Sequence, residues 1–175
     1  MRLAGEPIET PPRHPLDVGN TRRIETMSST LEPLEITPIG VVRNGEHDVR
    51  RQDWSRVRSE VELRPELAEA LEGLDGFSHV IVVGWLDQIP DELRERRQAY
   101  PGGDERLPLL GSFALRGARP NPIAVTVCRL RGVKGSTLRV EGLDLVDGTP
   151  VLDVKPYIAV YDAVPDAKLP RWAQG

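Results

Sequence analysis

Short apolar segments, each bounded by glycine, proline or aspartate turn signals, constrain the fold of this chain more than any other feature. Residues 77–85 contain four consecutive aliphatic residues, a run typical of a central strand. Residues 123–130 predict another strand, 132–135 a turn, and 137–140 its hairpin partner. Five or six such strands with two modest helices predict a mainly β fold and exclude a doubly wound α/β sheet.

The remaining segments predict smaller elements. Residues 36–43 alternate as an edge strand with a bulge would, and residues 59–63 predict a short strand. A helix is expected to start at Pro65 and to present an apolar stripe that runs to Leu74. Residues 90–100 predict a short, charged and solvated helix.

The chain of 175 residues is long enough for one sizeable core. Residues 1–34 are polar and interrupted by five prolines, so we expect a disordered N-terminal extension. The folded domain is predicted at residues 35–165 and a C-terminal tail at residues 166–175.

The charge distribution is uneven. Net charge is -4, which gives no overall signal for binding a polyanion. Residues 111–140, however, contain six basic side chains and no acidic one. Two interpretations stay equally open: one positive face on an acidic protein, or ordinary strands with solvated arginines.

The residues that usually bind metals are sparse. Cys128 is the only cysteine, so no intramolecular disulfide can form, which suits a reducing cytoplasm. The three histidines lack ligand spacing, and we therefore predict no metal. No apolar run is long enough to span a membrane, so no membrane association is predicted.

Two loops carry the polar groups that suit a ligand. In residues 111–124, Pro120 and Pro122 make a stiff arm that presents Asn121, with Arg116 and Arg119 just before it. In residues 141–150, Gly142 permits close backbone approach, and Asp144 and Asp147 supply hydrogen-bond acceptors. A structural ion pair is expected between Asp153 and Lys155, which alternation places on one face of a strand.

Four motifs occur in the same order as in a known protein family. They are PIGVVRN at residues 38–44, LDGFSH at 74–79, GSFALRGARPNPIA at 111–124 and GLDLVDGTPVLDVKPY at 142–157. Through them the chain resembles the TsaA/TrmO-like family. The resemblance implies a compact β-barrel-like domain of the TsaA/YaeB type with one or two short helices. It also implies S-adenosyl-L-methionine as cofactor, N6-methylation of threonylcarbamoyladenosine at tRNA position 37, and homodimers with cofactor sites near the subunit interface.

The same resemblance suggests roles for individual residues. It implies contacts with the cofactor from Arg116, Asp87, Gln88, Gly142, Leu143, Asp144, Asn121, Gln52, Asp53 and Trp54. Arg119, Arg129 and Arg131 are expected to bind the tRNA substrate. No nucleophile is required, because the cofactor carries its own electrophilic methyl group. The catalytic residue stays unknown, with His79 and Asn121 as candidates; His79 reads equally well as a hydrogen-bonded core residue.

The chain departs from the family pattern near these motifs. Asp87 replaces a histidine, Leu115 and Gly117 replace threonine and serine, and Ala124 replaces a glycine. These differences concern acceptor specificity, so a second hypothesis is a methyltransferase or a binding protein that uses S-adenosyl-L-methionine with a small molecule instead of tRNA. The tryptophans Trp54, Trp85 and Trp172 are the candidate aromatic residues of a subunit interface.

Overall fold

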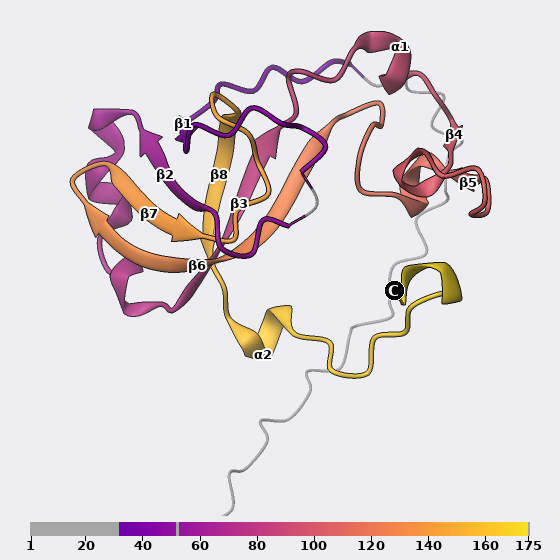
Figure 1. Cartoon of the computed structure of the whole chain (residues 1–175). Coiled ribbons are helices and arrows are strands. Elements are labelled where there is room, and N and C mark those ends of the chain that lie inside the picture. Colours follow the sequence, from indigo (N-terminus) through magenta and orange to yellow (C-terminus); the bar gives the residue numbers. More distant parts are fainter. Residues whose placement is uncertain (1–31, 52, 175) are drawn as a thin grey trace, which may run out of the picture. The chain divides into compact units, whose positions relative to one another are not determined.

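A closed barrel of six antiparallel strands forms the body of the protein (Figure 1). The computed structural model describes residues 32–51 and 53–174, and those from Glu35 onward form one compact unit. The strands occur around the barrel in the order β1, β2, β7, β6, β3, β8. Their bounds are β1 Gly40–Arg43, β2 Arg58–Leu63, β3 His79–Trp85, β6 Ile123–Lys134, β7 Thr137–Glu141 and β8 Pro150–Pro156. The mainly β fold class with a barrel is confirmed.

Short elements connect the barrel strands. Two α-helices of one turn each are α1 (Asp91–Arg94) and α2 (Ala159–Asp162), and β4 (Gln98–Ala99) pairs with β5 (Leu110–Gly111) in a separate ribbon. The 3-10 turns are η1 Pro65–Leu71, η2 Leu74–Gly76, η3 Pro101–Gly103, η4 Ser112–Ala114 and η5 Arg171–Ala173.

The barrel closes where β1 pairs with both β2 and β8. Gly40 lies opposite Leu63 on one side and opposite Val151 on the other. A side chain at Gly40 would bring its Cβ to 2.3 Å from the carbonyl oxygen of Glu62, which no residue other than glycine tolerates. The close approach of β1 and β2 at this point therefore depends on this glycine.

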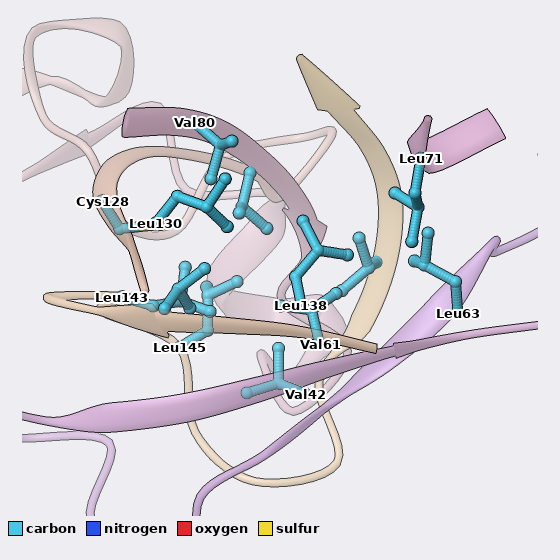
Figure 2. Packing of buried hydrophobic residues seen from close by; sticks show 13 residues of the cluster. Val42, Val61, Leu63, Leu71, Val80, Cys128, Leu130, Leu138, Leu143 and Leu145 are labelled. Atoms are coloured by element: carbon cyan, nitrogen blue, oxygen red, sulfur yellow. The ribbon is translucent and has the colours of Figure 1, made fainter. Parts of the chain in front are cut away.

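The hydrophobic core fills the inside of the barrel (Figure 2). Alternate residues of each strand point inward, so Val80 and Val82 of β3 are fully buried while the intervening Ile81 is half-buried. Leu143 and Leu145 join the cluster from the loop before β8. The loop between β7 and β8 is thus part of the core as well as a connection.

Several element predictions need correction. The helix expected from Pro65 is a 3-10 turn that ends at Leu71, and of residues 90–100 only Asp91–Arg94 are α-helical before β4 begins. β3 is central, pairing with β6 and β8, but it is fully buried on its inner side only. In a barrel only the inner face of each strand packs against the core, whereas in a sheet with helices on both sides both faces of each strand are packed.

Candidate functional site

A cavity of about 510 Å³ lies where three parts of the barrel meet. Its walls come from the segment after β3, from the segment that leads into β6 together with the first residues of that strand, and from the loop before β8. Trp54 and Val49 add to it from the loop between β1 and β2. The volume suits a small organic ligand.

Two arginines supply the positive charge of the cavity. Arg116 donates from Nη2 to the carbonyl oxygen of Val125, and Arg119 donates to the carbonyl oxygens of Leu115 and Gly117. Neither forms an ion pair with a carboxylate within the described ranges. Backbone carbonyls therefore position both guanidinium groups without neutralising them, which leaves their charge for an anionic group.

Two carboxylates and one carboxamide line the same cavity. Asp144 accepts a hydrogen bond from the hydroxyl of Thr126, which is itself buried in β6. Asp87 and Gln88 are exposed in the segment after β3. The cavity thus presents both signs of charge, and it suits a ligand that carries both.

The rest of the wall is apolar. Leu86, Ile89 and Leu93 follow β3, and Trp54 faces the same space. The indole nitrogen of Trp54 donates to the carbonyl oxygen of Arg51 at 2.9 Å, and the Arg51 guanidinium lies 5.7 Å from the centre of its ring. These contacts hold a flat aromatic surface at the cavity, suitable for a planar ring or an alkyl chain.

One carboxylate anchors the loop that carries Trp54. Asp147 accepts hydrogen bonds from the backbone amides of Asn44 and Gly45, at 2.7 and 3.0 Å. These amides, with a contribution from Arg43, lower the pKa of Asp147 below its ordinary value. The side chain of Asn44 donates to the carbonyl oxygen of Leu145, which ties the start of the same loop to the segment beside Asp144.

The cavity brings together six of the predicted site residues: Arg116, Asp87, Gln88, Asp144, Trp54 and Arg119. Four others lie beside it without lining it. Gly142 has a φ of 87° and donates its amide to Val57, while Leu143 is fully buried in the core. Asn121 is exposed, and Asp53 is held by Ser55, which lowers its pKa. Gln52 lies outside the described residues.

His79 does not line the cavity. It begins β3, whereas the lining residue of β6 nearest to it in register, Thr126, lies opposite Val82, about 10 Å further along the strand. Its Nδ1 shares a hydrogen bond with the Ser78 hydroxyl, and its ring meets Tyr157 edge-on with centroids 6.3 Å apart. These contacts match the structural interpretation of His79 better than the catalytic one.

The other predicted residues lie on the outside of the barrel. Arg129 and Arg131 project from β6, and Arg131 makes a forked ion pair with Glu141, with N to O distances of 2.8 to 3.1 Å. They are thus separate from Arg119, which lines the cavity. The expected pair of Asp153 and Lys155 forms at 2.6 Å with both side chains about half exposed.

Sequence reasoning did not single out Thr126 or the apolar wall after β3. Thr126 appears in the sequence only as a β-branched residue of a strand, and its hydroxyl gains a role because β6 lies beside the loop of Asp144. Buried Cys128 is no alternative reactive group, because burial, with the charge of Asp144, raises the pKa of its thiol to about 12. No cluster of three or more metal-ligating side chains occurs within residues 32–51 and 53–174.

Fold and cavity together define a small antiparallel barrel protein with a cavity whose lining carries both signs of charge. In the described part of the chain no helix is long and apolar enough to cross a membrane. Residues 46–163 match the model of the tRNA-methyltransferase O N-terminal domain. The chain belongs to this family, which confirms the resemblance drawn from its motifs.

Relatives and solved structures agree with this assignment. An S-adenosyl-L-methionine-binding protein of Archaeoglobus fulgidus is 35% identical over 74% of this chain and 93% of its own length. The tRNA (adenine(37)-N6)-methyltransferase of Escherichia coli is 38% identical over 57% of this chain and 44% of its own length. The crystal structure of TrmO from Pseudomonas aeruginosa gives a TM-score of 0.65 at 36% identity, covering 81% of this chain and 62% of that one.

Coverage of the relatives differs widely. The chain spans 95% of a relative from Methanothermobacter thermautotrophicus but only 37% of another from Archaeoglobus fulgidus. What the longer proteins do as a whole is therefore carried over only as a proposal.

Proposed function

We propose that this protein is a methyltransferase that uses S-adenosyl-L-methionine in the cavity beside β6. Family membership and the names of the relatives support the cofactor. The observation that carries the proposal is the charge pattern of the cavity, where Arg116 and Asp144 line the same space. The cofactor has a carboxylate, an ammonium group, a sulfonium and ribose hydroxyls, so it needs partners of both signs.

Each side chain has a defined task in this proposal. Arg116 binds the carboxylate of the cofactor, since its guanidinium has no competing acid within the described residues. Asp144 accepts from a hydroxyl or an ammonium group, and Trp54 covers the site from the loop between β1 and β2. The cofactor supplies the methyl group on its sulfonium. The protein then has to align the acceptor and exclude water, and the apolar wall after β3 does the latter.

For the acceptor we propose N6 of threonylcarbamoyladenosine at tRNA position 37. The similarity to the Escherichia coli enzyme supports this acceptor, as do the basic residues of β6. Arg119, at the cavity, is the residue best placed to contact the acceptor, and the arginines outside the barrel are available for the tRNA backbone.

A second candidate is transfer to a small molecule, or cofactor binding without transfer. Its support is that a relative covered over 93% of its length is named only as a binding protein. Asp87 also stands where a histidine is usual in the family, so the acceptor side of the cavity differs. A small acceptor would be methylated without any dependence on the outer arginines.

We also propose a cytoplasmic homodimer. Val125 and Val127 on the outer face of β6 are 48% and 49% exposed, and Val125 lines the cavity, which supports a subunit contact near the site. Sedimentation equilibrium of the purified protein tests the dimer, and a monomer at micromolar concentration would contradict it. The single buried cysteine, which needs no oxidising compartment, supports the location.

Calorimetry with S-adenosyl-L-methionine tests the cofactor. Arg116→Ala should weaken binding roughly 10- to 100-fold, because a hydrogen bond to a charged group contributes about 1.5–3 kcal/mol. Arg106→Ala serves as the matched control, since Arg106 is highly exposed and, within the described part of the chain, pairs only with Asp104. Equal affinities of wild type and Arg116→Ala would remove Arg116 from the site.

The acceptor is tested with tRNA from a strain that lacks this methylation. Incubation with the protein and the cofactor should add one methyl group to threonylcarbamoyladenosine, as measured by mass spectrometry of digested nucleosides. A protein that binds the cofactor yet leaves this nucleoside unchanged would favour the second candidate.

A further inference from the structure

The outer wall of the barrel opposite the core carries a second concentration of charge. Six basic side chains project from β1, β2, β6 and β7, and we call them the arginine strip: Arg43, Arg58, Arg129, Arg131, Lys134 and Arg139. Four carboxylates lie among them: Glu60, Glu62, Glu141 and Asp147. The strip is therefore basic on a chain whose net charge is -4.

Strand register places these side chains in rows. Arg43, Glu60, Arg139 and Gly132 lie opposite one another across β1, β2, β7 and β6. The next row consists of Arg58, Glu141 and Arg129. A shift of register between Leu130 and Gly132 inserts Arg131 between the two rows. Arg129 and Arg131 are two residues apart, so strand alternation places both on the outer face of β6.

Arg139 differs from the other arginines of the strip. Its neighbour across the strands is Gly132, and the guanidinium lies 3.6 Å from where a Cβ of that residue would be. The Arg139 guanidinium therefore lies against β6 at Gly132. Within residues 32–51 and 53–174 neither Arg139 nor Arg129 has a side-chain hydrogen bond or ion pair, although Glu60 lies directly opposite Arg139.

Three other arginines of the strip, Arg131, Arg58 and Arg43, pair with acids. Glu141 pairs with Arg131 at 2.8 Å and with Arg58 at 3.7 Å, and these arginines lower its pKa. Arg43 pairs with Glu62 at 3.2 Å, and both side chains are about half exposed. Water screens a pair this exposed, so Arg43 can exchange its carboxylate for a phosphate at little cost.

Two adjoining hollows follow the strip. One of about 630 Å³ is lined by Arg43, Arg58, Arg131 and Arg139 together with the polar Asn44 and Ser59. The other, of about 590 Å³, is lined by Lys134, Ser136 and Thr137, and both share Arg139 and Glu60. Neither hollow shares a lining residue with the cavity beside β6.

We propose that the arginine strip is a binding surface for consecutive phosphodiester groups of a nucleic acid, with Arg139 as its central contact. Arginine, serine, threonine and asparagine are the side chains that bind such backbones. Among the described residues, the only apolar one that lines either hollow is the buried Val140, so the two hollows lack the apolar groups that insert into a membrane. That the nucleic acid is tRNA rests on the proposed function. The strip itself does not depend on it.

The test measures binding of a tRNA transcript by fluorescence anisotropy at several salt concentrations. Arg139→Ser should reduce the slope of log K against log salt by about 0.7–0.9, the value for one lost phosphate contact. Arg139→Lys should retain the slope. Arg106→Ser, which removes an exposed arginine outside the strip, should leave the slope unchanged.

A variant that strengthens binding separates the proposal from mere damage to the fold. Glu60→Gln removes the acid between Arg43 and Arg139, so tRNA should bind more tightly. Glu69→Gln makes the same change of charge in η1, outside the strip, and should have a smaller effect. Equal effects of the two substitutions, or equal slopes for wild type and Arg139→Ser, would overturn the proposal.

The readouts distinguish this proposal from the proposed function. If Arg139→Ser lowers the slope but the wild type methylates no tRNA, the proposed methyltransferase is contradicted and the strip is supported. If the wild type methylates tRNA and Arg139→Ser does not change the slope, the methyltransferase is supported and the strip is contradicted. If inorganic phosphate displaces tRNA more strongly than chloride does at equal ionic strength, the strip binds free phosphate and the proposal is overturned. Equal affinity for anionic lipid vesicles would overturn it as well.

Discussion

At the scale of single residues, Asp144 shows how the barrel prepares a polar site. Its carboxylate is exposed to the cavity, but one of its oxygens accepts a hydrogen bond from Thr126 on a strand eighteen residues earlier. Thr126 is buried between β3 and the loop of Asp144. A rigid strand thus fixes the orientation of a carboxylate that belongs to a loop.

Thr126→Val removes this hydrogen bond while preserving the shape of the side chain. We expect the affinity for S-adenosyl-L-methionine to fall by at most roughly 10- to 100-fold, because one hydrogen bond to a charged group contributes about 1.5–3 kcal/mol. The melting temperature should change little, because a valine fits an inward strand position. Calorimetry and thermal unfolding measure the two quantities. Thr126→Ser, which keeps the donor, should bind like the wild type, and full affinity of Thr126→Val would show that Thr126 does not position Asp144.

Single residues also show how far sequence reasoning reaches. Arg116 and Asp144 belong to motifs far apart in the sequence, and both line the cavity, while their contacts with the cofactor stay a prediction. Leu143, adjacent to Asp144, belongs to the core instead. A motif marks a stretch of chain, but neighbouring side chains of an extended segment point in opposite directions. Which one faces the ligand is fixed by packing that the sequence does not display.

At the scale of elements, the loop between β1 and β2 depends on Asp147 near the start of β8. Its carboxylate accepts hydrogen bonds from two backbone amides of that loop, those of Asn44 and Gly45. Charged acceptors favour such hydrogen bonds, which is why the pKa of Asp147 is lowered from 3.8. The loop carrying Trp54 is therefore attached to the barrel by an interaction that depends on pH.

Asp147→Asn should destabilise the protein at pH 7 and matter less in acid. The pKa of Asp147 is lower in the folded protein than in the unfolded one. Its carboxylate therefore stabilises the fold above the unfolded pKa of about 3.8, and this stability is lost as pH falls through the folded pKa. The difference in urea midpoint between wild type and variant should thus shrink from pH 7 to pH 3. Asp166→Asn, at an exposed residue of the C-terminal segment, is the control. A difference that stays constant over this range would disprove the role of the Asp147 charge.

Strands were easier to predict than helices in this chain. The hairpin of β6 and β7 was evident because β-branched residues flank a glycine turn, and Gly135 has the positive φ of 58° that such a turn requires. The helix expected over residues 90–100 is limited to Asp91–Arg94, since β4 pairs with β5 immediately afterwards. Pairing partners more than ten residues away decide such cases, and local periodicity carries no information on them.

At the scale of the whole molecule, the core begins late in the sequence. Val42 is the first residue of the buried cluster among the residues described, and the cluster is complete at Val151. The predicted N-terminal extension, residues 1–34, lies largely outside the described residues, so its disorder stays a prediction.

Deletion of residues 1–26 should leave the melting temperature and cofactor affinity unchanged. That segment has too little apolar surface to contribute to a core. Differential scanning calorimetry of the full and shortened chains measures stability, and isothermal titration measures affinity. A drop of several degrees in the shortened chain would show that the extension docks on the folded domain.

The closure of the barrel at Gly40 also determines when the protein can finish folding. β1 needs β8 as a partner, and Gly40 and Val151 are more than a hundred residues apart in the chain. Contacts so distant in sequence slow folding, because a long loop must be ordered before they form. During synthesis on the ribosome, one edge of β1 therefore stays unpaired until β8 has been made. The loop that carries Asp144 directly precedes β8, so we expect the cavity to be among the last parts of the domain to take shape during synthesis.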